Sequence, residues 1–101
     1  MWTDGGLACS AGDTARIVDA ILTGRVTTKA TAADMFPSAG REYGLGIDSR
    51  DRWVGHAGSY GGFESEGWHD RARRLTIVAL ANREDVAAAS EVWQAIAGTW
   101  R

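Results

Sequence analysis

The stretch Gly55–Phe63, which reads Gly-His-Ala-Gly-Ser-Tyr-Gly-Gly-Phe, holds the residues of this chain whose types and spacing best suit chemistry. Its glycines allow the backbone to come close to a bound molecule, because glycine has no Cβ. Two kinds of site fit these residue types: a serine nucleophile on a sharp turn, and a metal or phosphate site.

A serine nucleophile is the first of these. Ala57–Gly61 fits a loosened G-x-S-x-G motif, in which Ser59 would be the nucleophile and His69 its base. Such a serine sits on a turn that opens directly into a helix, whereas Gly61, Gly62 and the polar residues after them are poor helix formers. Too few residues follow to supply an acid and a base in the usual order, so we disfavour this site.

A metal site would need His56 and His69 together with Glu64, Glu66 or Asp70. The sequence has neither H-E-x-x-H nor paired cysteines, and no G-x-G-x-x-G pattern precedes a helix. We therefore expect no metal and no cofactor. His69, beside Asp70, is expected to be an ordinary hydrogen-bonded surface histidine.

A purely structural interpretation assigns no chemistry to the stretch. In it, Gly55–Phe63 belongs to a glycine-rich turn region whose aromatic side chains fill the core. These side chains would be Trp53, Tyr60, Phe63 and Trp68.

Two helices are predicted before this stretch. Ser10, with Asp13 three residues later, suits the start of a helix over 11–23, and Gly24 suits its left-handed C-terminal cap. Thr28 suits the cap of a shorter helix through Met35, which the proline at position 37 prevents from continuing.

Four strands are predicted after these helices. Residues 42–47 and 52–56 are short β-prone runs with turn-forming residues 48–51 between them, so they are expected to form a hairpin. Residues 64–69 and 74–81 are expected to form the next two strands, joined by a polar turn. Because 75–81 is almost entirely apolar, we expect it to be a central strand covered on both faces.

A C-terminal helix is predicted from Asn82, which can act as its cap with two acids in the first turn. An apolar stripe at three- and four-residue spacing is expected to lie on the sheet, namely Val86, Ala89, Trp93, Ile96 and Trp100. The order of elements predicts the α+β class: an antiparallel sheet of about four strands with an N-terminal and a C-terminal helix packed on it.

Composition narrows the class of protein. A chain of 101 residues with 45% hydrophobic content makes at most one domain, residues 1–101, and its net charge of -2 with few clustered bases does not favour a nucleic-acid partner. No apolar run reaches the roughly 18 residues of a membrane span, and no basic region leads into an apolar one as in a signal peptide, so we expect a soluble chain of unknown compartment. The lone Cys9 is expected to be a small buried residue before the first helix.

The chain resembles the C-terminal part of the β-lactamase-related serine hydrolases, a family that includes class C β-lactamases, D-alanyl-D-alanine carboxypeptidases and esterases. The resemblance is carried in the family's order by Asp4–Leu7, the capped helix, Tyr43–Gly46, Gly55–Gly58, Gly61–Phe63, Trp68–Asp70 and Thr76–Asn82. It covers nearly all of the chain. It implies that the sheet is part of the β-lactamase/transpeptidase-like fold, present here as a single incomplete domain.

The resemblance also implies roles for residues. His56-Ala57-Gly58 matches the family's third active-site motif, so His56 would tune the proton network beside the nucleophile and Gly58 would let substrate lie close to the strand. The backbone N–H of Ser59 would be an oxyanion donor. Ala57 and Tyr60 would contact the substrate, a small ester, amide or β-lactam. Because Ala57 lacks the hydroxyl that often holds a substrate carboxylate, an ester or amide substrate is favoured over a β-lactam.

Two family motifs are missing. In the family the acylated serine lies in Ser-x-x-Lys, but the residue three positions before the only lysine, Lys29, is Val26. The second motif is Tyr or Ser, any residue, then Asn, but the residue two positions before the only asparagine, Asn82, is Leu80. We therefore expect a fragment of a serine hydrolase that is inactive alone. The alternative is a non-catalytic α+β module that keeps the fold. If strands are missing, the edge of the strand ending at Ala81 is unpaired, and self-association through it is expected.

Overall fold

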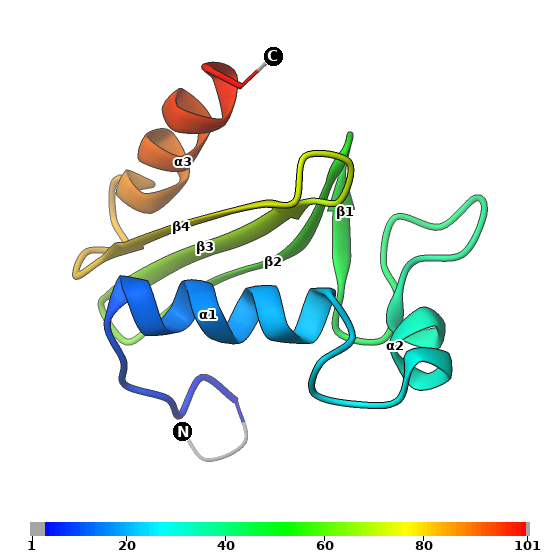
Figure 1. Cartoon of the computed structure of the whole chain (residues 1–101). Coiled ribbons are helices and arrows are strands. Elements are labelled where there is room, and N and C mark those ends of the chain that lie inside the picture. The colour runs from blue at the N-terminus through cyan, green and yellow to red at the C-terminus, as the bar shows by residue number, and fades with distance from the viewer. Residues whose placement is uncertain (1–3, 101) are drawn as a thin grey trace.

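The sheet has four antiparallel strands, and each strand pairs with the one that follows it in the chain, in the order β1-β2-β3-β4 (Figure 1). The structure, a computed structural model, describes residues 4–100. Its elements are α1 (Ala11–Leu22), α2 (Lys29–Met35), β1 (Asp48–Arg50), β2 (Trp53–Tyr60), β3 (Phe63–Asp70), β4 (Leu75–Ala81) and α3 (Ala88–Gly98).

The two long helices cover opposite faces of this sheet. Figure 1 shows α1 on one side and α3 on the other, and both pack mainly on β3 and β4. The predicted α+β class, with four antiparallel strands between an N-terminal and a C-terminal helix, is confirmed.

The face under α3 holds an aromatic core. Trp68 is fully buried, and the ring of Trp93 from α3 lies 5.5 Å from that of Trp53 and 5.6 Å from that of Trp68, measured between centroids. The indole N–H of Trp68 donates to the buried carboxylate of Glu66, which Arg50 approaches at 3.3 Å. These partners compensate the cost of burying an acid in an apolar layer.

The predicted helix caps are present in α1 and α2. The hydroxyl of Ser10 accepts from the N–H of Asp13 at 3.1 Å, and the hydroxyl of Thr28 accepts from the N–H of Thr31 at 3.1 Å. Gly24, two residues beyond α1, has φ +72°, a conformation that glycine adopts without strain.

The first predicted strand, residues 42–47, is wrong. β1 is only Asp48–Arg50, because the backbone around Gly44 packs against the end of α2 instead of along β2. The N–H of Leu45 donates to the carbonyl of Met35 at 3.0 Å, and a Cβ at Gly44 would lie 2.2 Å from that oxygen. β2 in turn runs beyond the predicted end at His56 to Tyr60.

One part of the prediction for β4 is confirmed and the other is wrong. α1 and α3 cover its two faces, as its apolar sequence predicts. It is nevertheless not central, because within residues 4–100 its only neighbour in the sheet is β3. Coverage by two helices makes a strand apolar on both faces even at the edge of a sheet.

The start of α3 is also wrong. The helix begins at Ala88, after Ala87 with φ +51°, and Asn82 lies at the end of β4. Its cap comes from the sheet, since the carboxylate of Glu64 accepts from the N–H of Ala89 at 2.8 Å. Of the predicted stripe, Ala89 and Trp93 are buried with Ala97, whereas Val86, Ile96 and Trp100 are exposed.

Three side chains expected in the interior lie at the surface. Cys9 is exposed, with its sulfur 3.0 Å from the hydroxyl of Thr14. Tyr60 and Phe63 face each other across the tip of the β2–β3 hairpin and are exposed, so only Trp53 and Trp68 of the four aromatic residues fill the core.

None of the helices in residues 4–100 has the length and apolar character that a membrane-spanning helix needs.

Candidate functional site

The alternation of side chains along β2 divides the predicted site residues between two faces. His56 is paired with Gly67, where a Cβ would lie 3.1 Å from Val18 of α1, so His56 is on the α1 face. Gly58 and Tyr60 share this face. The side chain of Ala57 is on the other face and packs against the tryptophan core.

α1 packs mainly on β3 and β4 and only slightly on β2. On this face of the sheet, the part of β2 next to β1 is therefore left uncovered by α1. His56 is therefore exposed, and its Nε2 lies 2.8 Å from the hydroxyl of Tyr43, in the loop before β1. The two rings meet edge to face, with centroids 5.7 Å apart. A phenol and an imidazole in direct contact can hold or pass a proton beside the strand.

The backbone of β2 has an open edge next to these rings. β1 pairs only with Trp53–Gly55, so the outer side of β2 from His56 onward has no strand neighbour among the described residues. Gly61 and Gly62, with φ +61° and +86°, form the two-residue turn in which the residue before the turn accepts from the residue after it.

The direction of each N–H along β2 follows from this turn. The pair Tyr60 and Phe63 exchanges hydrogen bonds, and hydrogen-bonded pairs alternate along antiparallel strands. Gly58 and His56 thus bond to β3, whereas the N–H groups of Ala57 and Ser59 point to the open edge. Gly58 lies between these two donors, and without a side chain it leaves access to them.

The side chain of Ser59 lies away from His56. Its hydroxyl is on the α3 face, 3.4 Å from the carboxylate of Glu84. Ser59 is inside a strand that continues through Gly61 and Gly62 into β3, not on a turn that opens into a helix. A nucleophile elbow at Ser59 is therefore wrong, as its poor helix formers predict.

The open edge brings together three residues that the sequence singles out and one that it does not. His56, Gly58 and the N–H of Ser59 lie together, while the methyl of Ala57 faces the core and Tyr60 lies at the exposed hairpin tip. Tyr43 is the addition. It stands in a motif of the resemblance, but a contact between residues 13 apart in the chain leaves no periodic signal in the sequence.

The family model described as Beta-lactamase matches residues 1–99. The chain belongs to the Beta-lactamase family. Among curated proteins, none matches the chain. The family match spans all the ordered motifs from Asp4 to Asn82, so the resemblance seen in the sequence is confirmed.

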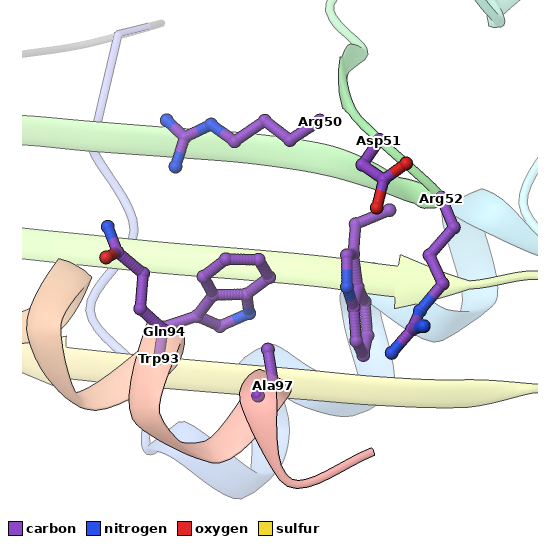
Figure 2. A pocket seen from close by; sticks show the side chains of 8 residues that line it. Arg50, Asp51, Arg52, Trp93, Gln94 and Ala97 are labelled. Atoms are coloured by element: carbon purple, nitrogen blue, oxygen red, sulfur yellow. The ribbon is translucent and has the colours of Figure 1, made fainter. Parts of the chain in front are cut away.

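This Beta-lactamase family chain has a cavity of about 480 Å³ on the α3 face, away from His56. Figure 2 shows Arg50 at the end of β1 and Asp51 and Arg52 of the β1–β2 turn on one side, and Trp93, Gln94 and Ala97 of α3 on the other. Both arginines are already paired: Arg50 with Glu66, and Arg52 with Asp70 at 3.1 Å. Their charge is therefore compensated inside the fold.

Asp70 ends β3 as a buried carboxylate with several donors. Burial acts to raise its pKa, but the N–H groups of Arg73 and Ala72 and the guanidinium of Arg73 donate to it and hold the pKa below its usual value. The carboxylate thereby ties the β3–β4 turn to the end of the sheet.

His69, expected at the surface, is instead only 2% exposed. Its Nδ1 lies 2.9 Å from the hydroxyl of Thr76, which lies 3.3 Å from the carboxylate of Asp19 in α1. Burial lowers the pKa of His69, against the opposing effect of Asp19 and Asp70, so the ring is neutral at pH 7. The polar pairing that the sequence predicts is present, but it is made by a buried ring.

A metal centre gains no support from these clusters. Among residues 4–100, no group of three or more histidine, cysteine, aspartate or glutamate side chains is placed to hold a metal ion.

Proposed function

We propose that this chain supplies one wall of the active site of a β-lactamase-like serine hydrolase. The observation that carries the proposal is the open edge of β2, where the N–H of Ser59 and the bare Gly58 lie beside the His56–Tyr43 pair. In this proposal the sheet is part of the β-lactamase/transpeptidase-like fold, and residues 1–101 are a single incomplete domain.

The reaction would be acyl transfer to a serine that this chain does not contain. A serine hydroxyl attacks the carbonyl carbon of an ester, amide or β-lactam, and the carbonyl oxygen becomes an oxyanion. The leaving group departs with a proton as the carbonyl reforms. Water then attacks the acyl-serine, which releases the acid and restores the hydroxyl.

The N–H of Ser59 would act on the oxyanion. A preorganised donor aimed at developing negative charge lowers a barrier by about 3 to 4 kcal/mol. No reorganisation of the strand is needed, because this N–H is not used in the β2–β3 ladder.

His56 and Tyr43 would serve the proton transfers at the same edge. Their hydrogen bond holds the imidazole in one orientation, and both groups can accept and donate a proton. In this proposal Tyr43 positions His56, and His56 tunes the protonation of the groups around the nucleophile.

The substrate would be a small ester or amide more readily than a β-lactam with a carboxylate. Ala57 offers no hydroxyl to such a carboxylate, and its methyl packs on the core. Tyr60, on the same face as His56, would flank the substrate from the hairpin tip.

The missing motifs decide what the chain does alone. Without Ser-x-x-Lys and Tyr/Ser-x-Asn in these 101 residues, no activated nucleophile stands before the open edge. We expect a fluorophosphonate probe to leave this chain unlabelled. The probe is expected to label a longer polypeptide, read from the extended coding sequence, that carries Ser-x-x-Lys.

Two substitutions at one position test the oxyanion role in that longer polypeptide. Ser59→Pro removes the N–H without breaking a ladder bond, and we expect labelling to slow by about 10² to 10³-fold. Ser59→Ala keeps the N–H and removes the hydroxyl, so its labelling rate should stay near that of the parent. Equal rates for the two variants would contradict the role, and stoichiometric labelling of Ser59 itself would overturn the proposal.

A second function, that of a non-catalytic α+β module, is favoured by the same missing motifs. It predicts that the extended reading frame contains no Ser-x-x-Lys within roughly one further domain length. It also predicts that Ser59→Pro changes the stability of the fold but no labelling rate, because there is no labelled nucleophile. The upstream sequence separates the two functions before any protein is made.

A further inference from the structure

A second cavity, of about 330 Å³, lies at the end of the sheet that carries the β3–β4 turn. Residues at the C-terminal end of α1, along α2 and in the β3–β4 turn line it. His69, which lines it, is paired with Val54, so the cavity is at the end of β2 opposite to Gly58 and Ser59. The proposed hydrolase site makes no use of it.

The cavity collects positive charge that the fold leaves uncompensated. Residues 4–100 contain ten lysine and arginine side chains, and six of them have a carboxylate partner within 4 Å. Three of the remaining four, Lys29, Arg71 and Arg74, line this cavity, and no carboxylate lines it. The fourth is Arg41. In a chain with net charge -2, this concentration of unpaired cations favours a bound anion.

One of these cations is held in place by an aromatic ring. The guanidinium carbon of Arg71 lies 4.4 Å from the centre of the Phe36 ring, and both residues line the cavity. The stacking leaves the N–H groups at the rim of the guanidinium plane available to an anion.

His69 adds a hydrogen-bond acceptor to these donors. The Thr76 hydroxyl donates to the carboxylate of Asp19, which can only accept, so this hydroxyl must accept from Nδ1–H of His69. The proton of the neutral ring is therefore on Nδ1, and Nε2 carries a lone pair.

This lone pair reaches the cavity. Nε2 of His69 makes no hydrogen bond with the described residues. The fully buried side-chain atoms that make no hydrogen bond in residues 4–100 are Arg52 Nε, which has only its ion-pair contact with Asp70, and Trp93 Nε1. Nε2 of His69 is not among them, so it touches accessible space. The cavity is the space that His69 lines.

We infer that this cavity binds hydrogen phosphate, with its anionic oxygens on Lys29, Arg71 and Arg74 and its P–OH donating to Nε2 of His69. The ligand must be an anion, because of the three unpaired cations, and it must also donate a hydrogen bond, because Nε2 only accepts. Hydrogen phosphate meets both demands. Sulfate has a similar shape and charge but no proton to donate.

The test is an NMR titration of the ¹⁵N-histidine-labelled chain with inorganic phosphate, sulfate or methyl phosphate at about pH 7.5. At this pH methyl phosphate has no proton to donate, because the second pKa of a phosphate ester is about 6. Phosphate is expected to saturate and to shift Nε2 of His69, while His56 stays unchanged. Sulfate and methyl phosphate should bind at least about tenfold more weakly, the loss of one good hydrogen bond.

Matched variants assign the charges. Lys29→Gln and Arg71→Gln should each raise the Kd for phosphate by about tenfold or more. Arg41→Gln removes an unpaired cation that does not line the cavity, and it should change this Kd by less than about twofold because Arg41 makes no direct contact with the bound anion. His69→Phe keeps a planar ring but has no acceptor, so it should abolish the preference for phosphate over sulfate; circular dichroism checks that it folds.

Three results would overturn the inference. They are no saturable binding of phosphate, equal affinity for phosphate and sulfate, and equal loss in Arg41→Gln and Arg71→Gln. If methyl phosphate matched phosphate, the role of Nε2 as acceptor would be wrong. The titration needs no hydrolase activity, so its failure is distinct from failure of the proposed function.

Discussion

At the scale of single residues, the two histidines acquire different chemistry from their surroundings. His56 is exposed on an open strand, and its Nε2 lies 2.8 Å from the hydroxyl of Tyr43, so the ring is accessible from solution. His69 is buried, hydrogen-bonded to Thr76, and neutral at pH 7, so its free nitrogen accepts. The residue type is the same, and the packing decides which role each can take.

The buried state of His69 predicts how stability depends on pH. Burial lowers the pKa of His69 below its ordinary value of about 6.5, so the unfolded chain binds a proton that the folded chain rejects. The stability that comes from the neutral ring is full above about pH 6.5 and is lost as the pH falls towards the lowered pKa. We expect urea unfolding to show a falling free energy over this window.

The matched variants for this prediction are His69→Gln and His56→Gln. The first should flatten the pH dependence below about pH 6.5, because glutamine does not titrate. The second should leave it as in the parent. The explanation would be wrong if both variants kept the same slope.

At the scale of elements, α3 depends on the sheet for its beginning. Its N-terminal N–H groups have no cap from the preceding loop, and Glu64 of β3 supplies the acceptor at 2.8 Å from the N–H of Ala89. A carboxylate at a helix N-terminus also interacts favourably with the helix dipole. One contact therefore stabilises the helix and fixes where it docks.

This cap predicts a difference between two substitutions of Glu64. Glu64→Ala should lower the free energy of unfolding by about 1 kcal/mol, the usual loss when a cap is removed. Glu64→Gln keeps an oxygen acceptor and should lose about half of that or less. Chemical denaturation measures both, and an unchanged midpoint for Glu64→Ala would show that the contact does not stabilise the helix.

At the scale of the whole molecule, the sheet has an uncovered edge in residues 4–100. In β3, alternate residues hydrogen-bond to β2, and the residues between them hydrogen-bond to β4. The backbone groups of Thr76, Val78 and Leu80 in β4 are therefore not used by β3 and point outward from the sheet edge. β4 contains no charge and no proline, the usual protections against edge pairing. We therefore propose self-association of the chain through β4.

Light scattering over a range of protein concentrations tests this proposal. The average mass should rise with concentration. Leu80→Pro removes an outward N–H without breaking the ladder to β3, and it should shift the chain towards the monomer. Leu80→Ala loses the same partly exposed side chain but keeps the N–H, so it should still associate. A monomeric parent that unfolds cooperatively would contradict the proposal.

The sequence by itself determined the features that depend on neighbours along the chain. The caps at Ser10 and Thr28, the glycine after α1 and the apolar run of β4 all act over a few residues, so composition and spacing reveal them. The ordered motifs likewise sufficed to place the chain in the Beta-lactamase family.

The tertiary structure alone decided the features that join distant segments. Glu64 caps a helix 25 residues later, Thr76 reaches Asp19 across 57 residues, and Tyr43 meets His56 only because its loop packs on α2. Such contacts follow from which faces the helices cover and which way each strand turns its side chains. A change of one residue in register would exchange those faces.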